Sequence, residues 1–435
     1  MRRFLFLQGP HGPFLSHLAR ALRDAGAEVR RVGFNAGDAA MWRGPGFIPF
    51  RGRAGDWPAF LDDLCARDRI TDILAYGASR WMHREAASLA RARGIVFHSL
   101  EEGYLRPYWI TYERGGSNGD SPLGRLTLAQ MRAALDHARP QPEGAPDGWG
   151  DLRAHMFWGA AYHTALLAGA RRWPGFVPHR SPGPAQEARL QLRNLAALPL
   201  RIAARRAATA RLLAAGRPFH LVLLQLAHDA NFRDHSSFTD QASLVDLILA
   251  GFATGAPPHH LIAFKAHPLE DGREPLRPLI RRLAHAHGLT DRVVFVPGGK
   301  LGHLLDHATS AVTVNSTAAH QALWRGLPLK VLGRAIYDRP ELVSAQDLPG
   351  FFAAPSPPDR AAYDDLRAFL LATSQVPGGF YSRAGRQRLL RRLPDLLLAH
   401  DCPYSALIGP EAASQHLRAA RRDPATSLEN RHALP

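Results

Sequence analysis

The feature that most constrains this 435-residue sequence is the alternation of short apolar runs with helical patterns, in two separate stretches. Strand-like runs in the first stretch fall at residues 3–7, 28–34, 70–76 and 95–100. Those in the second fall at 221–226, 261–266, 293–296, 311–314 and 329–332. Strands that regularly alternate with helices predict a parallel, doubly wound sheet, here formed twice.

The two stretches predict an α/β fold with two Rossmann-like domains that face each other across a cleft. We expect an N-terminal domain over residues 1–122, a helical insertion over 123–216 and a second Rossmann-like domain over 217–355. Helices follow over 356–410, and 411–435 form a polar tail.

Charge and cysteine content exclude several classes of protein. The net charge is +16, but lysine occurs only at Lys265, Lys300 and Lys330, so the excess is arginine spread along the chain. This indicates a compositional bias and not a nucleic-acid-binding patch, so we expect no nucleic-acid partner. Cys65 and Cys402 are too far apart for a disulfide framework or a zinc finger. Since no signal-like or membrane-spanning apolar run occurs, we expect a cytoplasmic protein, peripheral on the inner face of the membrane.

The turn after the first expected strand contains Gly9 and His11, in Gln8-Gly9-Pro10-His11-Gly12. The two glycines allow either a close approach of the backbone to a ligand or simply a tight strand-to-helix turn. There is no G-x-G-x-x-G fingerprint and no Walker A sequence, which argues against nicotinamide and ATP chemistry.

Two adjacent carboxylates, Glu101 and Glu102, stand at the end of the fourth strand, before Gly103 and Arg106. Their mutual repulsion would raise the pKa of one of them, as suits a general acid or base. The alternative is a solvated loop with an ion pair to Arg106. The aromatic run over residues 107–111 resembles a binding wall, and the polar loop at Asn118 could face an acceptor.

The first strand of the second stretch leads into Gln225, Asp229, His235 and Ser236. An aspartate just beyond a buried strand could act as a nucleophile or orient a sugar. The alternative role is an N-cap, which we prefer for Asp240 but not for Asp229.

Basic and hydroxyl residues follow two later strands. Lys265 and His267 are two residues apart before Pro268, so both side chains are expected on one strand face, where they suit a phosphate. Asn315, Ser316 and Thr317 join a strand to a helix, either as N-caps or as a phosphate cradle. No Asp-x-Asp pair ends a strand. A single phosphate needs no Mg²⁺ beside these cations, so we expect no metal or other cofactor.

Taken in order, these motifs resemble the capsule polysaccharide biosynthesis and export family, and within it the KpsS-type β-Kdo transferases. The resemblance covers most of residues 1–355. It includes the acidic Glu101-Glu102-Gly103 motif, Lys265-Ala266-His267-Pro268, Asn315-Ser316-Thr317 and the run over 333–338, while Ala318-Ala319-His320 departs from the expected glycine-containing turn. It implies a GT-B-like fold and a retaining glycosyltransferase that moves Kdo from CMP-Kdo onto a (lyso)phosphatidylglycerol lipid or a growing β-Kdo linker.

The resemblance also implies roles for residues. Asp229 is the candidate nucleophile, and Glu102 or Glu101 the acid/base. Lys265 and His267, with Pro268, Asn315, Ser316 and Thr317, would hold the CMP. The other expected cleft residues are Gly9, His11, Gly103, Arg106, Asn118, Gln225, His235 and Ser236. We expect Asp229, His267 and the Glu101/Glu102 pair to line one common cavity.

Two alternative functions are compatible with the same sequence motifs. A sialyltransferase that uses CMP-sialate shares the donor motifs, and a non-catalytic export component would bind finished polysaccharide. Expected partners are CMP-Kdo, a lipid acceptor at an anionic membrane and other capsule assembly and export proteins. Arginines of the insertion would dock on lipid headgroups, unless its helices simply pack on the sheets. They are Arg189, Arg193, Arg201, Arg205, Arg206 and Arg211.

Overall fold

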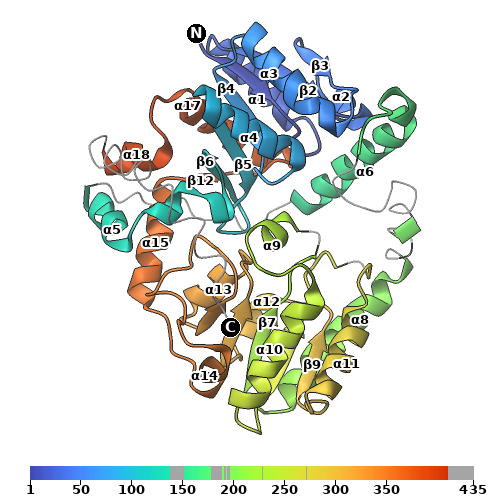
Figure 1. Ribbon diagram of the computed structural model, residues 1–435, viewed down its shortest axis with the longest axis vertical. Helices are drawn as coiled ribbons and strands as arrows, with labels where there is room; N and C mark the ends of the chain where they lie inside the picture. Colours follow the sequence, from blue (N-terminus) through green and yellow to red (C-terminus); the bar gives the residue numbers. More distant parts are fainter. Residues whose placement is uncertain are drawn as a thin grey trace.

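The computed structural model describes residues 1–137, 151–177, 189–190, 193, 196–227, 229–270 and 272–409. The chain forms two lobes, each built on its own sheet, drawn one above the other in Figure 1. The expected tail over 411–435 and most of residues 178–195 lie outside the described residues.

A seven-stranded sheet in the order β12-β6-β5-β4-β1-β2-β3 forms the first lobe. Its strands are β1 (Arg3–Phe6), β2 (Glu28–Gly33), β3 (Phe47–Pro49), β4 (Asp72–Tyr76), β5 (Val96–Glu102), β6 (Trp109–Arg114) and β12 (Gln375–Pro377). Strands β1 to β5 pair in parallel, whereas β6 pairs antiparallel with both β5 and β12. Its helices are α1 (Phe14–Asp24), α2 (Ala36–Met41), α3 (Trp57–Arg67) and α4 (Trp81–Arg93), with a 3-10 turn η1 (Ala54–Asp56).

Strand β1 shows why this sheet is buried on both faces. Phe4 and Phe6 pack in one apolar cluster, and Leu5 and Leu7 pack in another on the opposite face. Successive side chains of a strand point to opposite faces, so an unbroken apolar run requires a cover of helices on both sides.

The second lobe contains a parallel sheet of five strands in the order β11-β10-β7-β8-β9. The strands are β7 (Phe219–Leu223), β8 (Leu261–Lys265), β9 (Val293–Val296), β10 (Ser310–Thr313) and β11 (Leu329–Val331). The helices between them are α9 (Ala230–Asp234), α10 (Gln241–Gly255), α11 (Leu276–Ala286), α12 (Leu301–Leu305) and α13 (Ala319–Trp324). The carboxyl ends of β7 and β8 are in register, Leu223 opposite Lys265, so the loops that follow them emerge together.

The helices that stand in the sequence between the strands of the two sheets pack on different neighbours. Helix α5 (Leu128–His137) lies against α15 (Arg360–Ala372) and α18 (Pro403–Ile408). Helix α6 (Asp151–Gly169) lies against α2, and α8 (Leu198–Ala214) lies against β9. Short 3-10 turns η2 (Asn118–Asp120), η3 (Pro122–Arg125) and η4 (Ala170–Arg172) accompany them. The described helices therefore cover both lobes, as Figure 1 shows for α6 above and α8 below.

After the second sheet the chain returns to the first lobe. Helices α14 (Leu348–Ala353) and α15 (Arg360–Ala372) precede β12, and α16 (Arg383–Leu390), α17 (Leu393–Leu398) and α18 (Pro403–Ile408) follow it. The two parallel-sheet lobes confirm the predicted α/β, GT-B-like class. Strands β3, β6 and β12 were not expected, because two of them have three residues and the aromatic run that begins β6 was interpreted as a binding wall.

Candidate functional site

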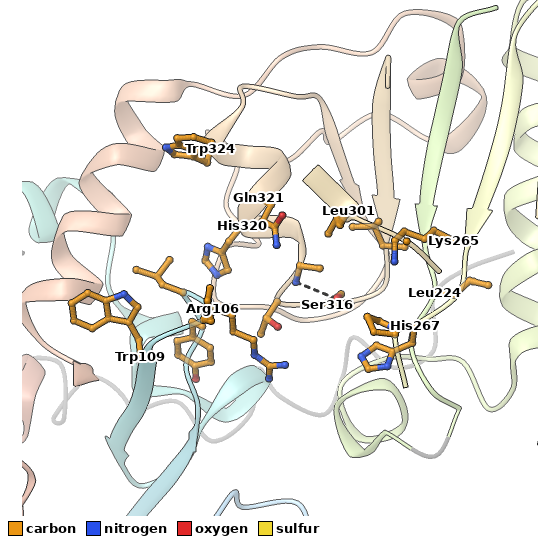
Figure 2. A pocket seen from close by; sticks show the side chains of 18 of the residues that line it. Arg106, Trp109, Leu224, Lys265, His267, Leu301, Ser316, His320, Gln321 and Trp324 are labelled. Atoms are coloured by element: carbon orange, nitrogen blue, oxygen red, sulfur yellow. Dashed lines mark hydrogen bonds between the residues drawn. The ribbon is translucent and has the colours of Figure 1, made fainter. Parts of the chain in front are cut away.

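A cavity of about 560 Å³ lies between the two lobes. The first lobe contributes Tyr104, Leu105, Arg106, Pro107 and Trp109, and the second contributes Lys265–Pro268 and Ser316–Ala318 among others. In Figure 2, Arg106 faces Ser316 and His267 across this space. All of the predicted donor-binding residues except Asn315 thus line one cavity, which we call the anion cavity.

Lys265 is the last residue of β8, and its side chain is 4% exposed. Within the described chain, its ammonium group makes one hydrogen bond, to the carbonyl of Ala266 at 3.3 Å. Burial, together with the charge of Arg205, lowers the pKa of Lys265 to about 8. A buried cation without a described carboxylate partner is costly in the folded protein, and a bound anion would offset that cost.

His267 lies beyond the end of β8 and also lines the anion cavity. The backbone N–H of Leu269 donates to His267 Nδ1 at 3.1 Å, so the proton of a neutral ring is on Nε2. Pro268 lines the same cavity. Lys265 and His267 therefore come together as predicted, although His267 is in the loop and not on the strand.

Ser316 and Thr317 line the anion cavity beside these cations. The Ser316 hydroxyl accepts from the N–H of Ala318 at 3.2 Å, which stabilises the turn before α13. Helix α13 itself begins at Ala319, and its N-cap, Ala318, has no side-chain hydrogen bond. Neither Ser316 nor Thr317 is therefore the N-cap of α13, and both residues line the anion cavity.

A second cavity of about 320 Å³ contains Glu101, Ser117, Asn118, Asp120 and His235 among its lining residues. We call it the acidic cavity. Glu101 Oε2 accepts from Asn118 Nδ2 at 2.5 Å, and Oε1 accepts from the Ser117 hydroxyl at 2.8 Å. Burial raises the pKa of Glu101 despite these two bonds; the charge of Asp229 raises it further and that of Arg106 lowers it. A carboxyl with a raised pKa suits proton transfer.

Glu102 lines neither of the two cavities. Leu100, two residues earlier on β5, packs with Tyr76 in one apolar cluster, and Glu102 is on this same face of β5 because side chains alternate along a strand. The side-chain alternation of a strand separates the two carboxylates, so they do not share one site. Gly103 ends the strand; a side chain there would overlap the carbonyl oxygen of Trp109. Arg106 lines the anion cavity and donates to the Gly103 carbonyl at 3.2 Å.

Asp229 is the N-cap of α9, where its Oδ1 accepts from the N–H of Asn231 at 3.0 Å. It lines neither cavity. Asp229 thus has the N-cap role that was the alternative to a catalytic one. Asp240, for which the cap was preferred, does cap α10.

The expected common cavity for Asp229, His267 and the carboxylate pair is therefore not found among the described residues. A polar wall separates the anion cavity from the acidic cavity. Gln225 Nε2 donates to Asn315 Oδ1 at 2.8 Å, and the backbone N–H of Asn315 donates to Gln225 Oε1 at 3.1 Å. Asn315 also donates to the carbonyl of Asn231, which lines the acidic cavity, while its neighbour Ser316 lines the anion cavity. Arg106 nevertheless acts electrostatically on Glu101, so the cavities are close.

His235 and Ser236 lie at the end of α9. His235 lines the acidic cavity and accepts a 3.1 Å hydrogen bond from Arg334 at Nδ1; burial lowers its pKa. Ser236 donates to the carbonyl of Phe232 at 2.5 Å and closes the helix. His235 thus contacts a cavity, whereas Ser236 has a structural contact.

Gly9 and His11 line neither cavity. A side chain at Gly9 would overlap Leu15 of α1, and the His11 ring lies 4.5 Å from the Tyr162 ring of α6, centroid to centroid. This loop is a tight strand-to-helix turn that α6 covers, the alternative considered above.

Residues that sequence reasoning missed also line the anion cavity. His320, in the departure from the family turn, is 4% exposed and burial lowers its pKa to about 3. Tyr363 and Arg367 come from α15, far along the chain. No local pattern singles these residues out, because only the return of the C-terminal segment brings them here. Among the described residues, no group of three His, Cys, Asp or Glu side chains could hold a metal ion.

The fold and the cavities define a two-lobed, GT-B-like α/β protein with a buried cation between its lobes. The profile of the capsule polysaccharide biosynthesis protein family matches residues 71–381. The chain is 33% identical over 381 residues to the capsule polysaccharide export protein KpsS of Escherichia coli, covering 87% of this chain and 97% of that protein. It is 31% identical over 393 residues to the capsule polysaccharide modification protein LipB of Neisseria meningitidis serogroup A, covering 87% and 91%. The chain therefore belongs to the capsule polysaccharide biosynthesis family, as its motifs predicted.

Two solved structures resemble the chain distantly. The β-Kdo 2,7 transferase of KpsC from Thermosulfurimonas dismutans is 13% identical with a TM-score of 0.43, over 91% of this chain and 99% of that one. HepE from Anabaena, in complex with UDP and glucose, is 10% identical with a TM-score of 0.33, over 96% and 100%.

Proposed function

We propose that this protein is a glycosyltransferase that moves Kdo from CMP-Kdo to a lipid-linked acceptor in capsule assembly. The observation that carries the proposal is the buried cation of Lys265 in a cavity between two lobes, with no carboxylate partner among the residues that the structure describes. The donor itself is taken from the motif resemblance and from membership of the family.

In this proposal the CMP phosphate binds in the anion cavity. Lys265 supplies an ammonium group, His267 the N–H of its Nε2, and Ser316 and Thr317 their hydroxyls. Arg106 faces the same space from the first lobe. Charge-assisted hydrogen bonds of this kind stabilise the cytidylate as it leaves.

Glu101 is the acid/base of the proposal. It lies in the acidic cavity with a raised pKa, and hydroxyl and amide groups fix its orientation. For transfer, the sugar of a donor whose phosphate lies in the anion cavity would extend past Gln225 and Asn315 to the acceptor hydroxyl beside Glu101. Transfer with retention through a covalent adduct would need a nucleophile, and Asp229 is the residue that the resemblance assigns. Because its side chain caps α9, the geometry favours an electrostatic role for Asp229.

The direct test is mass spectrometry of the product formed from CMP-Kdo and a synthetic lysophosphatidylglycerol. A product heavier by one or more Kdo residues, lost in Lys265→Met, is expected. Turnover with CMP-sialate but not with CMP-Kdo would show that the donor is CMP-sialate and that the protein is a sialyltransferase. Binding of capsular polysaccharide without release of CMP from either donor would leave a non-catalytic export component.

We also propose that α6 contacts the anionic inner face of the membrane. Leu152, Met156 and Phe157 on this helix are 70%, 62% and 64% exposed, next to exposed Arg153. Apolar side chains beside cations suit an interfacial helix. Two arginines expected to dock are already engaged, since Arg201 and Arg205 donate to the carbonyls of Glu270 and Pro297. No described helix is long and apolar enough to span a bilayer.

Co-sedimentation with phosphatidylglycerol vesicles tests the membrane contact. Replacing Met156 and Phe157 with aspartate should reduce the bound fraction severalfold. Leu247→Asp, at an exposed leucine of α10, is the matched control and should bind like the wild type. Equal binding by all three proteins would refute the contact.

A further inference from the structure

We propose that Glu113 is a positioning residue, which holds Glu101 in place through Tyr104 and Asn118. The hydrogen-bonded chain stands on its own geometry, whereas its catalytic consequence rests on the proposed function of Glu101.

Glu113 lies on β6 and is fully buried. Three hydroxyl groups donate to its carboxylate. Tyr104 donates to Oε2 at 2.7 Å, Ser121 donates to Oε1 at 2.5 Å, and Tyr404 of α18 also donates to Oε1. Both oxygens are therefore acceptors, which is the hydrogen-bonding pattern of an ionised carboxylate.

The series of hydrogen bonds continues from Tyr104 to Glu101. The Tyr104 hydroxyl accepts from the backbone N–H of Asn118 at 2.7 Å, and the Asn118 side chain donates to Glu101 at 2.5 Å. Asn118 has a φ of 57°, a left-handed conformation that is sparsely populated except by glycine, asparagine and aspartate. The hydrogen bond to Tyr104 thus holds the residue that in turn orients the candidate acid/base.

The direction of the Tyr104 proton is what makes the charge of Glu113 matter. An ionised Glu113 accepts that proton and leaves the lone pairs of the phenol oxygen for the N–H of Asn118. When Glu113 is protonated or replaced by glutamine, one of its positions becomes a donor. Its hydrogen bonds to the three hydroxyls then cannot all persist, and the contact with Asn118 weakens.

Several titratable groups surround Glu113. They are Tyr104 from the loop after β5, Tyr404 from α18 and Glu101 from β5, whose charge opposes ionisation. Arg339 binds the carbonyls of Leu123 and Leu126 beyond Ser121 and acts on Tyr404. Burial is the main cause that raises the pKa of Glu113 to about 7, despite the three hydroxyl groups. The chain of hydrogen bonds is therefore poised to respond near neutral pH.

Hydrogen exchange followed by mass spectrometry tests the chain without any substrate. In Glu113→Gln and in Tyr104→Phe, peptides over residues 115–121 should exchange at least about fivefold faster at pH 8. Tyr112→Phe is the matched control: it removes a buried hydroxyl from the neighbouring residue of β6, one that contacts His98. That variant should exchange like the wild type over the same peptides. Unchanged exchange in both Glu113→Gln and Tyr104→Phe would overturn the proposal.

Kinetics test the consequence for Glu101. Glu113→Gln should lower kcat about tenfold with the KM for CMP-Kdo within twofold, and the double variant with Tyr104→Phe should lose little more. Because Glu113 becomes protonated as the pH falls through about 7, Glu113→Gln should also lose the part of the acid limb of the pH–rate profile that this protonation causes. A buried residue with only a structural role would leave that limb in place, and this result would refute the positioning role. Absence of turnover in the wild type would refute the proposed function instead. The hydrogen-exchange measurement would still test whether Glu113 and Tyr104 hold Asn118 in place.

Discussion

Lys265 is the residue on which the anion cavity depends. Its burial and its single described hydrogen bond mean that no carboxylate in the described part of the protein compensates its charge. Such a group is retained at a cost in stability, which is common where a site must bind a ligand of the opposite charge. Replacement of Lys265 by an uncharged residue should therefore weaken anion binding and raise the free energy of unfolding.

Lys265→Met should weaken the binding of CMP at pH 7 by roughly 10- to 100-fold, because a charge-assisted hydrogen bond contributes about 1.5–3 kcal/mol. The same change should raise the free energy of unfolding by roughly 1–3 kcal/mol, since the folded-state pKa of Lys265 lies below its usual value. Isothermal titration calorimetry and urea unfolding measure the two effects. Lys330→Met, whose ammonium group binds the carbonyls of Ser344 and Gln346 outside both cavities, should leave CMP affinity unchanged. A loss of stability in Lys265→Met would contradict the argument.

The pH dependence of binding follows from the same group. Lys265 is protonated below about pH 8 and neutral above it. The affinity of the wild type for CMP should therefore fall as pH rises from 7 to 9, whereas that of Lys265→Met should be nearly constant. A wild-type affinity that stays level over this interval would show that Lys265 does not contact the phosphate.

Asp229 offers a test between covalent and electrostatic catalysis. Asp229→Asn keeps an N-cap for α9 but removes the charge that helps to raise the pKa of Glu101. We expect kcat to fall less than about tenfold and the acid limb of the pH–rate profile to move to lower pH. A nucleophile would instead cost about a thousandfold or more. Asp240→Asn makes the same change at the cap of α10 and should have no effect on either measurement.

At the scale of elements, the β5–β6 hairpin joins the two cavities. Glu101 near the end of β5 lines the acidic cavity, while Arg106 and Trp109, after the turn, line the anion cavity. Gly103 allows this turn, because its N–H donates to the carbonyl of Trp109 at 2.8 Å and no side chain fits there. The position of the hairpin thus fixes the spacing between the candidate acid/base and the candidate phosphate site.

Gly103→Ala should lower the free energy of unfolding by about 1–3 kcal/mol, because the new methyl group overlaps backbone that cannot move without opening the hairpin. Urea unfolding measures this effect. Gly124→Ala, at a glycine with nothing within 4 Å of the added methyl group, should unfold within about 0.5 kcal/mol of the wild type. Equal stability of the two variants would show that the turn can accommodate a side chain.

At the scale of the whole molecule, buried carboxyl groups set part of the response to pH. The folded-state pKa of Glu113, about 7, lies above its ordinary value of 4.5. The folded protein therefore binds this proton more tightly than the unfolded chain. The contribution of Glu113 to stability is complete below about pH 4.5 and is lost as pH rises through 7.

Comparison of the wild type with Glu113→Gln isolates that contribution. Relative to its value at pH 5, the stability of the wild type at pH 8 should decline by roughly 2–3 kcal/mol more than that of the variant. Urea unfolding at the two pH values measures the difference. A pH-independent difference would mean that Glu113 does not titrate within this range.

The sequence by itself determined the two α/β lobes, the positions of most strands along the chain and the family. Strand positions follow from unbroken apolar runs such as Phe4–Leu7, since a strand buried on both faces has no polar positions. The proximity of Lys265 and His267 was also predictable from local sequence, because Lys265 ends β8 and His267 follows two residues later. Residue types and spacing along one segment carry this information.

Only the tertiary structure decided which of those residues share a cavity. Strand alternation separated Glu101 from Glu102, a polar wall of Gln225 and Asn315 divided the anion cavity from the acidic cavity, and a helix cap engaged Asp229. The third hydroxyl on Glu113 comes from Tyr404, which is 291 positions away in the chain. Contacts between segments so far apart depend on how helices and strands pack against each other, and no local pattern in the sequence records that packing.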